Sequence, residues 1–161
     1  MHYLSRKSEK TTELGQSLGR ILKGGEIIVL EGDLGGGKTT FTKGVALGLG
    51  IKNEIISPTF TIERQYVSQS QKSKVKSQNL ALHHFDFYRI DSPNDIVGLE
   101  LKEVLSDKNS ITVIEWGNKI EEILPKERLE IKFKYVNENT RKIIFEPKGE
   151  RYKRLIEEFR I

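Results

Sequence analysis

The sequence contains no cysteine, and this absence excludes several kinds of chemistry. A chain of 161 residues without cysteine has no disulfide, no thiol nucleophile and no thiolate metal site. Histidine is also scarce, because only His2, His83 and His84 are present. A histidine-rich metal centre is therefore not expected either.

Long apolar runs are lacking as well. No apolar stretch approaches the roughly 20 residues that a membrane-spanning helix needs, and the first residues lack the apolar core of a signal peptide. We therefore expect a cytoplasmic protein. The 27 Lys and Arg against 23 Asp and Glu leave a net charge of +4, which permits a nucleic-acid partner. No basic stripe interleaved with aromatics indicates one.

Residues 32–39 (GDLGGGKT) fit the phosphate-binding pattern G-x-x-x-x-G-K-[ST]. In that pattern glycines let backbone N–H groups point at phosphates, the lysine reaches the β- and γ-phosphates, and the hydroxyl ligates Mg²⁺. The pattern assigns these roles to Lys38 and Thr39. The predicted nucleotide-binding residues of this glycine-rich loop are Gly35, Gly36, Gly37, Lys38, Thr39 and Thr40.

The flanking sequence supports a phosphate loop over an ordinary glycine-rich turn. Residues 26–31 are mostly apolar and β-branched, as a buried strand should be. After the loop, Phe41, Val45 and Leu49 recur at helical spacing, and Gly50 is a suitable helix end. Strand, loop and helix thus follow in the required order.

The remaining pattern predicts an α/β P-loop NTPase fold in one domain (1–161), with a mostly parallel sheet, flanking helices and an antiparallel edge. Further strands are expected near 61–67, 80–88, 111–114, 129–135 and 142–145. Helices are expected over 8–23, with Ser8 as a possible cap, after Pro93, and over 152–159. The Ser, Gln and Lys of residues 68–79 predict a flexible loop. Its lysines are more typical of a solvated loop than of a binding patch.

Two acidic residues are candidates for placing Mg²⁺ and water, as catalytic partners of Lys38. Asp86 lies on the same face of its strand as His84 and Tyr88, and the alternative is a structural aspartate bonded to loop amides. Glu115 directly follows a buried strand, where ligands gather in open α/β sheets. The alternative for Glu115 is an end-of-strand salt bridge.

Two further features lie near these acids in sequence. Ser57 and Thr59 belong to residues 57–61 (SPTFT), which predict either a switch loop that senses the γ-phosphate or a simple strand entry. Trp116, the single tryptophan, is interpreted as core, base-stacking surface or partner contact.

The ordered set of motifs resembles the TsaE family, the bacterial ATPases needed to make threonylcarbamoyladenosine in tRNA. The resemblance rests on the glycine-rich loop, on residues 57–61, on residues 84–89 (HFDFYR) and on residues 114–116 (IEW), and it runs from about Thr11 to Leu129. Two departures are visible. Gly36 stands where the family usually has Ala, and the 68–79 segment is longer than usual.

The resemblance implies an ATPase that uses ATP and Mg²⁺ and acts with the TsaB–TsaD pair. It implies that Thr39 and Glu115 hold the metal, that Asp86 supports the metal or water, that Trp116 lies at the rim of the active site, and that Thr11 lies near the nucleotide. Direct contact with tRNA stays open.

Other functional classes compete with this interpretation. Residues 118–121 (NKIE) resemble the guanine-reading N-K-x-D motif and residues 95–98 (DIVG) fit D-x-x-G, so a small GTPase-like switch is one alternative. Both matches are imperfect, since Glu121 replaces an aspartate and Asp95 does not follow a buried strand. A nucleotide-dependent binding module with negligible turnover and a small-molecule phosphotransferase are further alternatives.

Overall fold

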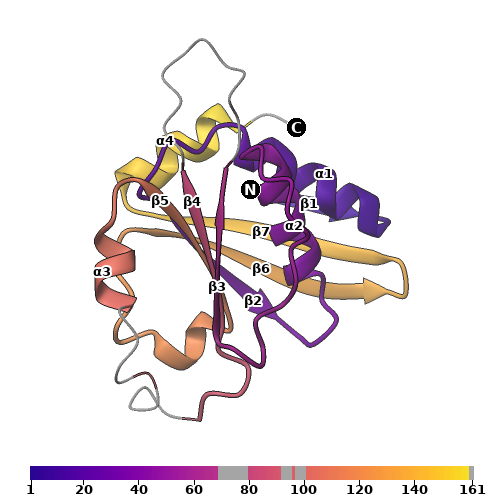
Figure 1. The fold of residues 1–161 in the computed structure, drawn as a ribbon. Helices are drawn as coiled ribbons and strands as arrows, with labels where there is room; N and C mark the ends of the chain where they lie inside the picture. Colours follow the sequence, from indigo (N-terminus) through magenta and orange to yellow (C-terminus); the bar gives the residue numbers. More distant parts are fainter. Residues whose placement is uncertain (69–79, 92–95, 97–100, 160–161) are drawn as a thin grey trace.

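The computed structural model describes residues 1–68, 80–91, 96 and 101–159, and within these residues seven strands form one sheet (Figure 1). The spatial order of the strands is β1-β7-β6-β2-β5-β4-β3. The elements, in chain order, are β1 (His2–Ser5), α1 (Ser8–Gly19), β2 (Ile27–Gly32), α2 (Lys38–Gly48), β3 (Glu63–Val67), β4 (Ala81–Asp86), α3 (Leu101–Ser106), β5 (Ser110–Glu115), the 3-10 helix η2 (Gly117–Ile120), β6 (Arg128–Asn137), β7 (Thr140–Lys148) and α4 (Glu150–Glu158).

The centre of the sheet is parallel. β2 lies between β6 and β5, β5 pairs with β4, and all three of these pairings are parallel. β2 and β5 are runs of buried apolar residues, which is the pattern of strands covered on both faces. The carboxyl ends of β2, β5 and β4 therefore meet at one edge of the sheet.

The prediction of a mostly parallel sheet is wrong in its proportions, although the mixed α/β class and the antiparallel edge are as predicted. Among the described residues three strand pairs are parallel, and the pairs β6–β7, β1–β7 and β3–β4 are antiparallel. Antiparallel strands thus flank the parallel centre on both sides. β1 was not predicted, because its four residues are defined by pairing with the distant β7.

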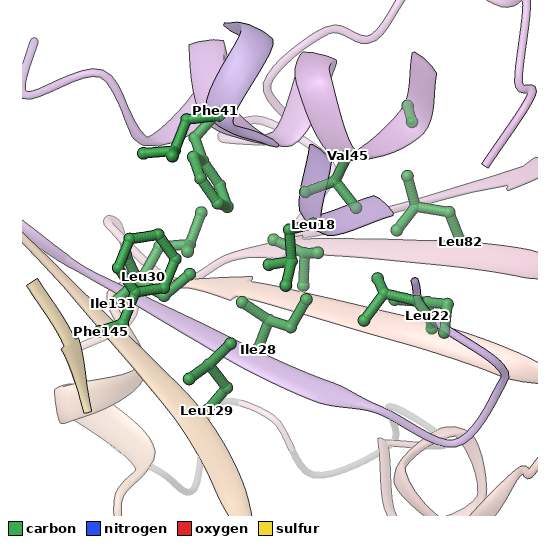
Figure 2. Packing of buried hydrophobic residues seen from close by; sticks show 14 of the residues in the cluster. Leu18, Leu22, Ile28, Leu30, Phe41, Val45, Leu82, Leu129, Ile131 and Phe145 are labelled. Carbon is green, nitrogen blue, oxygen red and sulfur yellow. The ribbon is translucent and has the colours of Figure 1, made fainter. Parts of the chain in front are cut away.

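Alternation along the central strands divides the core into two clusters on opposite faces of the sheet. Ile28 and Leu30 of β2 belong to the larger cluster, which also contains apolar residues of α1, α2 and α4 (Figure 2). Ile27 and Val29 point to the other face, where they meet residues of α3 and η2. Each face of the parallel centre is therefore covered.

The predicted helices form, with shifted ends. α1 ends at Gly19, before the predicted stop, and Ser8 is its first residue and makes no side-chain capping bond. The prediction of a Ser8 cap is wrong, because Lys7 occupies the capping position. Tyr152 and Leu155 of α4 and Phe159, which follows it, are buried as expected, while Ile156 is partly buried. No helix within the described ranges is long and apolar enough to cross a membrane.

Two predicted segments fall largely outside the described residues. Of the helix predicted after Pro93, the structure describes Ile96 and the helical residues from Leu101 onward. Of the loop predicted over 68–79, it describes Ser68. Ser68 itself is buried and its hydroxyl donates to the Leu49 carbonyl at 2.8 Å. It thus belongs to the packed structure.

α1 and α2 pack against each other backbone to backbone. Four glycines, spaced four residues apart on each helix, make this approach possible: Gly15 and Gly19 on α1, Gly44 and Gly48 on α2. A Cβ on any of them would overlap a carbonyl oxygen of the other helix. The contact fixes α1 firmly against the helix that follows the glycine-rich loop.

We predict that Gly44→Ala destabilises the protein. The new methyl group would overlap the Thr12 carbonyl oxygen, and such overpacking typically costs about 1–3 kcal/mol. It outweighs the gain in helix propensity of up to about 1 kcal/mol. Chemical denaturation measures the difference. Lys43→Ala, one residue earlier on the exposed face of α2, should change stability by less than about 0.5 kcal/mol. A Gly44→Ala variant as stable as the original chain would contradict the packing argument.

Candidate functional site

The carboxyl edge of the parallel strands carries a cavity of about 340 Å³, called here the main cavity. The glycine-rich loop follows β2, and Asp86 and Glu115 are paired residues at the ends of β4 and β5. The main cavity is lined by residues 34–40 and by Ser57, Thr59, Asp86, Tyr88, Glu115 and Trp116. The structure therefore brings together most of the site residues predicted from the sequence.

The glycine-rich loop presents unpaired backbone donors. Gly35 and Gly37 have φ values of 70° and 101°, which are left-handed conformations that favour glycine. Gly36 N–H donates to the Asp33 carbonyl at 3.0 Å, but the amides of Gly35, Gly37, Lys38 and Thr39 find no acceptor among the described residues. Free amides at the start of α2 are suited to an anion such as a phosphate.

Lys38 lies buried beneath the rim of the main cavity. Its ammonium donates to the carbonyls of Gly32 at 2.7 Å and Asp33 at 2.9 Å. Burial lowers the pKa of Lys38, while the nearby carboxylates of Glu115 and Asp86 act in the opposite direction. The site thus holds a partly desolvated cation beside two acids. The desolvation strengthens the attraction of the Lys38 ammonium for an anionic ligand.

Glu115 is hydrogen-bonded through one of its two carboxylate oxygens. Thr39 Oγ1 donates to Glu115 Oε1 at 2.9 Å, and His84 Nε2 lies 2.9 Å from the same oxygen. No described residue bonds to Glu115 Oε2. The alternative considered for Glu115 was an end-of-strand salt bridge. The partner found at the strand end is His84, and this contact leaves the second carboxylate oxygen of Glu115 free.

The donor set fits a small divalent cation. The Thr39 hydroxyl and the Glu115 carboxylate are adjacent oxygen donors on the wall of the main cavity. The described residues contain no group of three or more His, Cys, Asp or Glu that would hold a metal alone. Mg²⁺ needs no such group, because it is commonly bound by one or two carboxylates together with waters and substrate phosphates.

Asp86 anchors a neighbouring loop. Its Oδ2 accepts hydrogen bonds from Ser57 Oγ at 2.8 Å and Thr59 Oγ1 at 2.5 Å, and its Oδ1 accepts one from the Tyr88 amide at 2.9 Å. This arrangement matches the structural alternative in part, since one partner is a loop amide. It also links Ser57 and Thr59 directly to the wall of the main cavity.

The 57–62 loop is strained at its end. Ile62 has a φ of 66°, which is rare for a β-branched residue, and its amide donates to the Pro58 carbonyl at 2.6 Å. Such a conformation costs about 1–3 kcal/mol. Phe60, at the centre of the loop, is 82% exposed and lies under the Arg89 guanidinium. The segment that leads into β3 is thus a strained turn bonded to Asp86.

Trp116 covers Lys38. Its ring centroid lies 4.2 Å from the Lys38 ammonium and 5.3 Å from the Tyr88 ring, and the residue is half-buried. Trp116 also has a left-handed backbone, with a φ of 61°. It is therefore a wall of the main cavity and not a fully buried core residue.

Thr11 lies on the other side of the glycine-rich loop, in a second cavity of about 210 Å³. This side cavity is also lined by Gly35, Gly36, Gly37, Thr40, Ser5, Lys7, Ser8, Glu138, Asn139 and Arg141. Thr11 Oγ1 is hydrogen-bonded to Ser5 Oγ at 2.7 Å. The structure thus places Thr11 beside the loop, but it does not bring it to Asp86 and Glu115.

Sequence reasoning assigned no role to several residues around the site. His84 was placed on the same strand face as Asp86, but its contact with Glu115 depends on β4 lying next to β5, which the sequence does not specify. Arg141 reaches the side cavity from the β6–β7 hairpin, whose position is likewise a tertiary property. The signals available for His84 were strand alternation and its place at the start of residues 84–89, one of the motifs that carry the family resemblance.

The N-K-x-D-like stretch has structural partners. Lys119 Nζ donates to the carbonyls of Tyr88 at 2.5 Å and Ile90 at 2.8 Å, and Glu121 lies 3.4 Å from Arg128. Neither Lys119 nor Glu121 lines the main or the side cavity. Of the D-x-x-G-like stretch, only Ile96 is among the described residues.

Residues 5–143 match the family described as Threonylcarbamoyl adenosine biosynthesis protein TsaE. A protein of Bacillus subtilis named tRNA threonylcarbamoyladenosine biosynthesis protein TsaE is 40% identical over 93% of this chain and 87% of its own length. A Treponema pallidum protein of the same name is 36% identical over 89% of this chain and 98% of its own length. A crystal structure of Bacillus subtilis YdiB superposes with a TM-score of 0.79 at 35% identity, covering 99% of this chain and 93% of the other.

Proposed function

The chain belongs to the TsaE family, and on that basis we propose that it is a magnesium-dependent ATPase of the P-loop class that acts in the formation of threonylcarbamoyladenosine in tRNA. One observation carries the ATPase part of the proposal. Free loop amides, the Lys38 ammonium and the Thr39–Glu115 oxygen pair share the wall of one cavity. These are the parts that binding and hydrolysis of a nucleoside triphosphate require.

The residues of the main cavity have distinct roles in this proposal. The free amides between Gly35 and Thr39 hold the phosphates, and Lys38 neutralises charge on the transferred and leaving groups. Thr39 and Glu115 hold Mg²⁺, which when bound neutralises charge on the phosphate oxygens. Glu115, supported by Asp86, positions the attacking water. Ser57 and Thr59 connect Asp86 to the 57–62 loop, so this loop is suited to respond to the γ-phosphate.

The nucleotide is proposed to be ATP. In the stretch that resembles a guanine-reading motif, Lys119 and Glu121 are held by structural contacts, and neither residue lines either cavity. The side cavity, where Thr11 and Thr40 lie beside the loop, provides the remaining predicted nucleotide contacts. Competition between ATP and GTP for the purified chain tests this choice, since a clear GTP preference would favour the GTPase alternative.

The TsaB–TsaD pair is the proposed partner, as the resemblance implies. Three large apolar side chains are exposed near the mouth of the main cavity: Leu34 at 73%, Phe60 at 82% and Tyr88 at 40%. Exposed apolar side chains beside a ligand site are suited to contact with a partner. Docking there would cover the nucleotide and couple its state to the partner.

Reconstitution tests the function as a whole. We predict that tRNA threonylcarbamoylation by TsaB–TsaD with the other pathway components requires this chain together with ATP and Mg²⁺, measured by mass spectrometry of digested tRNA. Omitting the chain should remove the modified nucleoside, and Lys43→Ala should restore it as well as the original chain. Full modification without the chain would refute the role. Modification that needs the chain but continues with a non-hydrolysable ATP analogue would instead favour the nucleotide-dependent binding module.

A further inference from the structure

His84 is a fully buried polar side chain next to the proposed metal site. It comes from the interior of β4, where it is paired with Val113 of β5, and it is 0% exposed. Its Nε2 lies 2.9 Å from Glu115 Oε1. Its other ring nitrogen, Nδ1, has no hydrogen-bond partner among the described residues. Burying a polar atom without a partner is unfavourable, so packing alone does not account for a histidine at this position.

The contact fixes the direction of the hydrogen bond. The Glu115 carboxylate only accepts, so Nε2 carries a proton and donates to Oε1, while Nδ1 has no partner among the described residues. His84 therefore acts on Glu115 as a fixed N–H donor. The ring is fully buried, so it has no water to turn to.

Thr39 and His84 hold the same oxygen but differ in their surroundings. Thr39 lies at the start of α2, next to the glycine-rich loop that would contact the nucleotide. His84 lies inside β4, and its one side-chain hydrogen bond among the described residues is to Glu115. Together the two donors hold Oε1, and no described residue bonds to Oε2. Of the two, only His84 orients the carboxylate independently of the ligand.

We propose that His84 is a positioning residue that orients the Glu115 carboxylate for Mg²⁺ before nucleotide arrives. The inference rests on the proposed function, since it assigns Glu115 Oε2 to the metal. Donors that fix a metal-binding carboxylate commonly contribute to metal affinity although they never touch the metal. Orientation in advance removes the need to order the carboxylate when the metal binds.

A matched pair of substitutions isolates the donor. His84→Gln keeps an N–H group at the same number of bonds from the backbone as Nε2, and His84→Met has similar length and volume but no donor. The measurement is the dissociation constant of ADP by calorimetry, with and without Mg²⁺, and the ratio of the two constants reports the contribution of the metal. ADP affinity without Mg²⁺ and thermal unfolding show whether each variant is folded.

We predict that His84→Met reduces the Mg²⁺ contribution about tenfold, while ADP affinity without the metal stays the same. His84→Gln should stay within about threefold of the original chain. Equal behaviour of the two variants, whether both retain or both lose the metal contribution, would overturn the inference. An original chain whose ADP affinity ignores Mg²⁺ would instead refute the proposed metal site, so the two failures are distinguishable.

Discussion

ATP hydrolysis should fall by about 10³-fold or more in Lys38→Ala, because a preorganised charge at the transferred phosphoryl group is lost. Lys38 is the cation that lines the main cavity beside the free loop amides. Because the Lys38 ammonium is partly desolvated, its charge acts more strongly on a phosphate than a water molecule in its place would. Nucleotide affinity should weaken as well, since the lysine also contacts the ground-state phosphates.

The same substitution tests whether the effect is local. In the structure Lys38 donates to the carbonyls of Gly32 and Asp33, and because Gly32 is half-buried and Asp33 is exposed, water can replace the lost ammonium. The fold should therefore persist, as judged by circular dichroism. Lys43→Ala removes an exposed lysine from the same helix and should leave turnover unchanged. Turnover that survives Lys38→Ala would place the active site elsewhere.

The second large effect is expected for Glu115→Gln. This substitution keeps the side chain's size and an oxygen that accepts from Thr39 and His84, and it removes only the negative charge. Mg²⁺-dependent hydrolysis should decrease by at least about 10²-fold, because the metal loses its charged ligand and the water loses its orienting carboxylate. Steady-state rates over a range of Mg²⁺ concentrations measure the loss.

Glutamine is a sharper test than alanine at this position. Glu115→Ala would leave the buried His84 N–H without an acceptor, a loss that costs about 1–3 kcal/mol of stability. Glu122→Gln is the matched control, because Glu122 is an exposed glutamate seven positions later in the chain. If Glu115→Gln retains turnover with the original Mg²⁺ dependence, the metal-binding acid must lie elsewhere.

Much of the site could be anticipated because it depends on local pattern and one rule of sheet architecture. Short apolar runs in the sequence predicted the strands β2 and β5. The alternation of side chains along a strand predicted that Asp86 and His84 share one face of β4. Ligand-binding groups gather at the carboxyl ends of parallel strands. These features predicted that the glycine-rich loop, Asp86 and Glu115 would lie together, and the structure places them around one cavity.

The features that were missed depend on which elements become neighbours. The sequence does not specify that β4 lies beside β5, so the His84–Glu115 contact was not foreseen. β1 becomes a strand only by pairing with β7 at the far end of the chain. Gly15 and Gly44 look like weak helix residues in isolation, and their purpose appears only when the two helices meet.

The backbone contact between α1 and α2 also constrains where the protein can respond to its ligand. Because the two helices meet backbone to backbone, neither can move closer to the other, and we expect the glycine-rich loop at the start of α2 to move little when a ligand binds. Structural change on ATP exchange must then arise across the cavity, where hydroxyl bonds to Asp86 and the left-handed Ile62 hold the 57–62 loop. If the proposed partner binds, a signal to it would pass through this loop, in which Phe60 is exposed.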